Sequence, residues 1–127
     1  MDHNRELLER LWTPDSELAL SPEAEHEMRT EDYVLEMPQS GERIVGRDPM
    51  RAMQQEYPNP PSIEILRITG SGDNFVVLGR SDYGGDVYYV ANVVEFRDGR
   101  IARETRIYGA PFDPPAWRAK YATSPPQ

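Results

Sequence analysis

Four apolar runs joined by very short turns fill the second half of the chain, and they constrain the fold more than any other feature. The runs cover residues 63–69, 74–83, 87–96 and 100–108, with apolar side chains recurring at a period close to two. Gly and Asp dominate the segments between them, as is typical of tight turns. Because such short connections leave no room for crossover helices, the sequence predicts a four-stranded antiparallel meander.

The first residues of the chain have the periodicity of a helix instead. Residues 3–12 place four apolar side chains on one stripe, with charged residues elsewhere. These side chains are Leu7, Leu8, Leu11 and Trp12. Pro14 follows and ends the pattern, so we expect a short amphipathic helix whose apolar stripe faces the sheet.

Two further helix starts and one more strand precede the meander. Ser21-Pro22-Glu23 combines a capping hydroxyl, a proline suited to the first helical position and an early acid. Asp48-Pro49 gives the same signal for a third helix, which Pro58 closes. A short strand is expected at residues 33–37. We therefore predict one α+β domain over residues 1–127, with a core at 1–110 and a proline-rich tail at 111–127.

Charge and composition exclude several classes of function. The 14 basic and 22 acidic residues give a net charge of −8, whereas nucleic-acid binding relies on clustered Lys and Arg. With no cysteine, thiolate nucleophiles, disulfides and Cys-ligated metals are excluded. No apolar stretch approaches the roughly 20 residues that a membrane span needs. We expect a cytoplasmic protein with no nucleic-acid or membrane partner.

The third run of the meander is apolar on both faces. One face would present Tyr88, Val90 and Asn92, and the other Tyr89, Ala91 and Val93 (residues 87–96). An antiparallel sheet covered on one side ordinarily has one polar face. We therefore expect the second face to be covered by another copy, in a homodimer that buries Tyr89, Ala91 and Val93.

The order of these elements, together with several local segments, resembles a known superfamily. The segments are residues 31–38, Gly41 to Arg47, Ser71-Gly72-Asp73, and residues 94–101 running into Tyr108. They resemble the nuclear-transport-factor-2-like superfamily, and its SnoaL-like branch in particular. The resemblance implies a cone in which a strongly curved sheet wraps around three N-terminal helices and encloses a deep apolar pocket. The superfamily hosts isomerases, epoxide hydrolases, cyclases, dehydratases and non-catalytic binding modules, so the fold alone does not name the function.

Within that fold, strand alternation suggests which side chains share the pocket. With Asn92 pointing inward, its own strand also contributes Tyr88 and Val90. The other strands would contribute Glu104, Arg106 and Tyr108, then Leu78, Arg80 and Asp82, and finally Val34 and Glu36. Trp12 would complete the wall. Convergent carboxylates, guanidiniums and a phenol in an apolar pocket favour general acid–base chemistry.

Arg80-Ser81-Asp82 resembles the Arg-x-Asp segment of limonene-epoxide-hydrolase-type members, in which the pair helps activate water. This resemblance implies Asp82 as base and Arg80 as its orienting partner. We also expect Asn92 and Tyr108 to donate hydrogen bonds to the substrate oxygen. That family's second aspartate falls on Arg106 here, so the triad is not reproduced. Glu36 and Glu104 are alternative carboxylates. In another interpretation, Arg80, Glu104 and Arg106 form a cross-strand charge ladder while Asp82 caps a turn.

Ketosteroid-isomerase chemistry in its familiar form is disfavoured, because that family's base falls on Met37 and its oxyanion-hole acid on Asn92. His3 and His26 lie in the acidic helical region, where we expect surface positions rather than a metal site. We therefore predict an enzyme without metal or cofactor that acts on an apolar, polyketide- or terpenoid-like small molecule. Its reaction would be epoxide opening, cyclisation, dehydration or isomerisation. The alternative is a non-catalytic ligand-binding or dimerisation module.

Overall fold

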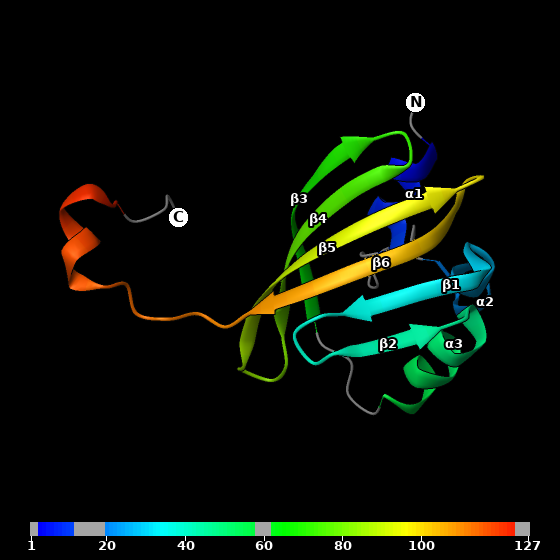
Figure 1. Cartoon of the computed structure of the whole chain (residues 1–127), viewed down its shortest axis with the longest axis horizontal. Helices are drawn as coiled ribbons and strands as arrows, with labels where there is room; N and C mark the ends of the chain where they lie inside the picture. The colour runs from blue at the N-terminus through cyan, green and yellow to red at the C-terminus, as the bar shows by residue number, and fades with distance from the viewer. Residues whose placement is uncertain (1–2, 12–19, 58–61, 124–127) are drawn as a thin grey trace.

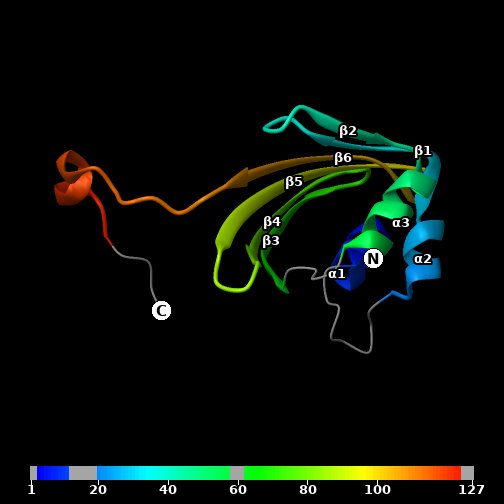
Figure 2. The same cartoon turned by 90° about the horizontal axis from the view of Figure 1, so that it is seen from below.

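The computed structural model describes residues 3–11, 20–57 and 62–123, and it has the α+β architecture expected from the sequence. A curved six-stranded sheet carries the helices on its concave side (Figure 1, Figure 2). The helices are α1 (His3–Leu11), α2 (Pro22–Glu27) and α3 (Arg47–Glu56). The strands are β1 (Arg29–Met37), β2 (Glu42–Val45), β3 (Ser62–Ser71), β4 (Asn74–Asp82), β5 (Val87–Arg97) and β6 (Arg100–Gly109). A 3₁₀ helix, η1 (Ala116–Tyr121), follows.

The sheet has the order β2-β1-β6-β5-β4-β3. β3 to β6 form the predicted antiparallel meander, whereas β1 pairs with β6 in parallel and makes the sheet mixed. This single parallel pairing brings the first strand beside the last. The side chains of α2, α3 and β1 thereby lie over the same concave surface as those of β5 and β6 (Figure 2).

Helix α2 begins as its sequence predicts. The Ser21 side chain accepts a hydrogen bond from the backbone N–H of Ala24 at 3.1 Å, and Pro22 occupies the first turn, where no intrahelical donor is needed. Helix α3 begins one residue earlier than the Asp48-Pro49 signal, directly after Gly46. Gly46 has φ +100°, a left-handed conformation that favours glycine, and its N–H donates to the Tyr33 carbonyl.

Two features of the first half were not predicted. β1 begins at Arg29, four residues before the expected start, and β2 forms a hairpin with it through the turn at Gly41. β2 has only four residues, all intermediate or exposed, so it lacks the clean alternation that identifies a strand. Trp12, Pro14 and Pro58 lie outside the described residues.

The hydrophobic core lies between the helices and the concave face of the sheet. Leu8, Met50 and Leu35 are fully or almost fully buried, and Phe75 packs edge-to-face on Phe96 with ring centroids 5.8 Å apart. Met28, which follows α2, is also buried. Among the described residues, none of the helices combines the length and apolar character that crossing a membrane requires.

The convex face of the sheet and the C-terminal segment both expose large apolar side chains. On β4, β5 and β6 these are Val76, Tyr89, Val93 and Ile107, which we call the outer patch. Residues 109–123 are all exposed, and those from 110 onward, which we call the arm, project away from the sheet at the end remote from the helices (Figure 1). Within the arm, the 3₁₀ helix η1 covers Ala116–Tyr121.

Candidate active site

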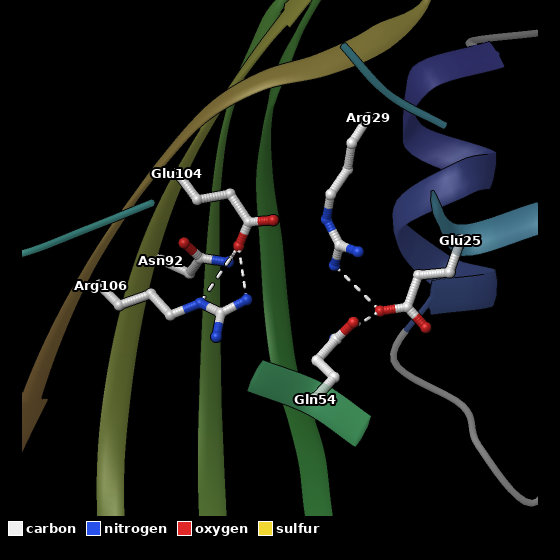
Figure 3. A network of polar contacts seen from close by, with 6 residues as sticks. All are labelled: Glu25, Arg29, Gln54, Asn92, Glu104 and Arg106. Carbon is white, nitrogen blue, oxygen red and sulfur yellow. Dashed lines mark hydrogen bonds and ion pairs between the residues drawn. The ribbon is translucent and has the colours of Figure 1, made fainter. Parts of the chain in front are cut away.

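A cavity of about 770 Å³ opens on the concave side of the sheet. This volume suits a small organic molecule. Its walls are mainly apolar, with Leu35, Met37 and Val77 from the sheet and Met50 and Met53 from α3. Two groups of polar side chains interrupt these walls (Figure 3). One group is on β5 and β6, and the other is on α2, α3 and the start of β1.

The sheet-side cluster consists of Asn92, Glu104 and Arg106. Glu104 is completely buried, and its Oε2 accepts hydrogen bonds from Asn92 Nδ2 at 2.9 Å and from Arg106 Nε and Nη2 at 3.1 and 2.7 Å (Figure 3). Asn92 and Arg106 line the cavity, and Glu104 lies behind them. The carboxylate therefore fixes the orientation of a guanidinium at the cavity wall.

Electrostatics keeps this pair ionised. Burial by itself raises the pKa of Glu104, but the charges of Arg106 and Arg29, with the hydrogen bonds from Asn92 and Arg106, lower it below its usual value. Burial likewise opposes the charge of Arg106, yet Glu104 raises its pKa overall. Glu104 is therefore a weak base, better suited to holding Arg106 than to accepting a proton.

Several buried polar atoms near this cluster have no hydrogen-bond partner within the described part of the chain. They are Asn92 Oδ1, Glu104 Oε1 and the hydroxyl of Tyr33. Because Asn92 must direct its amide N–H₂ toward the carboxylate, its Oδ1 is left as an acceptor. Burial raises the pKa of Tyr33, and the neighbouring Glu104 charge raises it further, so the phenol stays protonated. Buried polar groups ordinarily find partners, so a water or ligand group is expected to complete the cluster.

The helix-side cluster consists of Glu25, Arg29 and Gln54. Glu25 Oε1 accepts hydrogen bonds from Arg29 Nη2 at 2.9 Å and from Gln54 Nε2 at 2.8 Å (Figure 3). Arg29 is only 2% exposed and lies over the Tyr33 ring, with its guanidinium carbon 5.2 Å from the ring centroid. The Glu25 side chain is 24% exposed and lines the same cavity as Arg106. The cavity thus has an oriented cation on one wall and an oriented carboxylate on another.

Six of the residues expected in the pocket do lie at or directly behind the cavity wall. All six come from β5 and β6, where the predicted alternation of faces is right. They are Tyr88, Val90, Asn92, Arg106 and Tyr108 at the wall, with Glu104 behind.

The expectation that Leu78, Arg80 and Asp82 face the chamber is wrong. They lie on the opposite face of β4 from Ser81, which lines the cavity. Asp82 is exposed, and its Oδ1 accepts a hydrogen bond from the Gly85 N–H at 2.7 Å. The interpretation of Asp82 as a turn cap is therefore the one that fits its contacts.

Val34 and Glu36 were also assigned to the wrong face of their strand. Leu35 and Met37 line the cavity, while Glu36 pairs with Arg103 at 2.9 Å on the outer face. The expected cross-strand ladder does not form: Glu104 and Arg106 do pair, but both lie on β6, and Arg80 lies on the other face of the sheet. Trp12, expected in the wall, lies outside the described residues.

The same rule of alternation could have corrected both strands. Residues 75, 77, 79 and 81 carry no charge, whereas Arg80 and Asp82 occupy the alternate positions. The helix-side cluster was missed because Glu25 and Arg29 belong to an acidic run that is typical of a solvated helix face.

His26 lies against Asp48 at 2.8 Å, and no group of His, Cys, Asp or Glu residues in the described ranges could hold a metal ion.

Comparison with known proteins gives a family model and several solved structures. The model described as "SnoaL-like domain" matches residues 5–104. None of the curated proteins matches. An NTF-2 like protein of unknown function from Burkholderia xenovorans LB400 is 31% identical, with a TM-score of 0.84 over 98% of this chain and 96% of that chain.

Two further structures are similar in fold. A putative ketosteroid isomerase from Kribbella flavida DSM 17836 is 24% identical, with a TM-score of 0.84 over 98% of this chain and 91% of that one. A putative SnoaL-like polyketide cyclase from Jannaschia sp. CCS1 is 16% identical, with a TM-score of 0.67 over 84% of this chain and 85% of the other.

Proposed function

This chain belongs to the SnoaL-like domain family, with the NTF2-like fold, and on that premise we propose that it is an isomerase- or cyclase-type enzyme. It uses its own side chains to move a proton on an apolar small molecule that carries a carbonyl group. The solved structures named as a putative ketosteroid isomerase and a putative polyketide cyclase share its fold, which supports this class of reaction but not a particular substrate.

One observation carries the proposal. The oriented guanidinium of Arg106 and the oriented carboxylate of Glu25 line one apolar cavity. A cation fixed before the substrate arrives can stabilise negative charge that develops on a substrate oxygen, at little cost of reorganisation. A carboxylate at the same cavity can accept the proton whose removal creates that charge.

The chemical step follows from these two roles. Glu25 takes a proton from the carbon next to the substrate carbonyl, and the electron pair of the C–H bond moves to the carbonyl oxygen beside Arg106. In a substrate with a β,γ double bond, Glu25 returns the proton at the γ carbon of the dienolate, which shifts the double bond and isomerises the substrate. In a substrate with a second carbonyl, the enolate carbon attacks that carbonyl and closes a ring, and the alkoxide so formed takes the proton from Glu25. Asn92 Oδ1, a buried acceptor, suits a neighbouring hydroxyl of the substrate.

A second candidate is a non-catalytic module that binds such a molecule. Glu25 at the cavity wall and Glu104 behind it are each paired with an arginine, and Glu104 has a lowered pKa. A pocket with internally compensated charges can hold a ligand without reacting with it.

Deuterium exchange in D₂O separates the two candidates. The probe is 2-tetralone, a bicyclic ketone small enough for the cavity, and proton NMR follows deuterium incorporation beside its carbonyl. We expect the protein to accelerate this exchange above the buffer rate, and Arg106→Met to remove most of the acceleration. If the ketone raises the melting temperature while exchange stays at the buffer rate, the binding module is correct and the enzyme proposal is wrong.

A further inference from the structure

The arm combines large exposed apolar side chains with a stiff backbone. Phe112, Trp117 and Tyr121 are 78%, 71% and 76% exposed. Single exposed apolar residues are common, but three within ten residues on a projecting segment mark an interaction site. The hydrogen bonds of η1, from Arg118 N to Pro115 O and from Ala122 N to Ala119 O, lie within the arm itself.

Prolines hold the arm in an extended form. Pro111, Pro114 and Pro115 precede η1, and Pro115 has φ −61° and ψ 139°, the polyproline II conformation. An extended proline-rich spacer loses little conformational entropy when it docks. It also carries the arm away from its own sheet rather than back onto it (Figure 1, Figure 2).

The outer patch is an apolar surface of matching chemistry. Register places its members side by side: Val76 pairs with Val93, and Ala91, between Tyr89 and Val93 on β5, pairs with Ile107. All four patch side chains are 37–49% exposed, on the face of the sheet away from the helices. In the described part of the chain before the arm, eight large apolar side chains are exposed, and this patch holds half of them.

Charge favours attachment to another copy of the same chain. The arm and the tail after it (residues 110–127) contain Arg118, Lys120 and Asp113, a net charge of +1. The remainder of the chain therefore carries −8 − 1 = −9. Two chains of this charge repel each other overall, so the basic arm is the segment whose charge is complementary to the acidic body of a second molecule. Arg118 and Lys120 lie over the Trp117 and Tyr121 rings, at 5.9 and 5.0 Å, so the apolar and basic groups of η1 are presented together.

We propose that the arm docks on a second copy of this chain, with Phe112, Trp117 and Tyr121 covering the outer patch of that copy. The exchange is reciprocal, because each molecule has one arm and one patch, and it closes as a two-fold symmetric dimer. The sequence predicts a dimer from the strand that is apolar on both faces, and the arm supplies a specific contact for it. The arms, and not the sheets alone, hold the two copies together.

Sedimentation equilibrium of the full chain over a wide concentration range tests this. We expect a mass of about 29 kDa, twice the 14.6 kDa of one chain. Replacing Phe112, Trp117 and Tyr121 together with Ser should give the monomer mass, as should Val93→Glu on the patch. The matched control, Leu66→Ser, removes an exposed apolar side chain outside the outer patch and should leave the dimer intact.

Fluorescence of Trp117 in a Trp12→Phe background reports where the arm lies. We expect emission typical of a buried indole in the dimer, shifting to that of an exposed indole when Val93→Glu is added. Three results would overturn the proposal: a monomeric full chain, a dimer that survives the triple Ser variant, or buried Trp117 emission in a monomer, which would mean that the arm folds back on its own sheet. Circular dichroism of each variant confirms that the body stays folded.

Discussion

Glu104 has an unusual position for a carboxylate, since it is completely buried and still ionised. Its three donors and the nearby arginines stabilise the charged form more than burial destabilises it. A carboxyl whose pKa is lower in the folded state than in the unfolded state stabilises the fold above the unfolded pKa. That stabilisation is lost as the pH falls through the folded pKa.

Replacing Glu104 with Gln should therefore make the free energy of unfolding depend less on pH in the acid range. We expect the wild-type free energy of unfolding to fall as the pH drops below the ordinary Glu value of 4.5, and the variant to show a smaller fall. At neutral pH the variant should be about 3–5 kcal/mol less stable, because Arg106 loses its buried partner. Urea unfolding from pH 2.5 to 7 measures both. Exposed Glu64→Gln is the control, and an equal slope in all three proteins would contradict the assignment.

Glu25 is the residue on which the proposed proton transfer depends. Glu25→Gln preserves its size and one acceptor for Arg29 and Gln54, but it removes the basic group. We expect carbon–hydrogen exchange of a bound ketone to slow by about 10²- to 10⁴-fold, the usual worth of general base catalysis. Glu27→Gln on the same helix, whose side chain is 67% exposed, should leave the rate unchanged. Equal rates in the two variants would reject Glu25 as the base.

Asp82 should behave as a structural residue. Asp82→Asn weakens the bond to the Gly85 N–H, so we expect a loss of about 0.5–1.5 kcal/mol in stability, the usual net worth of one hydrogen bond. Exchange and ligand affinity should stay at wild-type levels, because the side chain lies on the face away from the cavity. A large loss of activity with unchanged stability would return Asp82 to the site.

At the scale of strands, most of the fold and about half of the site followed from the sequence. Period-two patterning and Gly-Asp turns located the meander, and alternation gave the correct faces of β5 and β6. On β4 the resemblance of Arg80-Ser81-Asp82 to a catalytic segment predicts one face and the polarity of the residues predicts the other, and the structure agrees with polarity. Glu25 and Arg29 are four residues apart, a spacing at which an ion pair can form locally. Gln54 of α3 joins them across 29 residues, a tertiary contact that local patterning does not encode.

The β3–β4 turn supplies a prediction about a single glycine. Gly70 has φ +126°, and a Cβ added there would lie 2.2 Å from the Asn74 carbonyl oxygen, so backbone must move. Gly72, two residues on, has φ +63° and open space around it. We expect Gly70→Ala to lower the free energy of unfolding, measured with urea, by well beyond the roughly 1 kcal/mol expected for Gly72→Ala. Similar losses in the two variants would show that the turn relaxes freely.

At the scale of the whole molecule, the sheet contains pairings between strands that are neighbours in the chain and one pairing between strands that are far apart in it. The three hairpins of the meander join neighbours, whereas β1 pairs with β6, so Leu35 lies opposite Glu104 across 104 − 35 = 69 residues. Closing so long a loop costs conformational entropy that only the completed pairing returns. The meander, with the Asn92–Glu104 bond inside it, is therefore expected to form before β1 and the helices dock.

Pulse-labelled hydrogen exchange during refolding can detect that order. Amides of β4 and β5 should gain protection before those of β1 and β2, and simultaneous protection would contradict the two-step order.

The parallel pairing also has a consequence for synthesis on the ribosome. β6 is the last strand to leave the exit tunnel. β1 and the helices α1 to α3 therefore emerge before β6, the strand with which β1 pairs, and before the sheet that the helices cover. The apolar side chains that later line the cavity are exposed throughout that interval. Nascent chains that end before Gly109 are therefore the state in which chaperones have most apolar surface to protect.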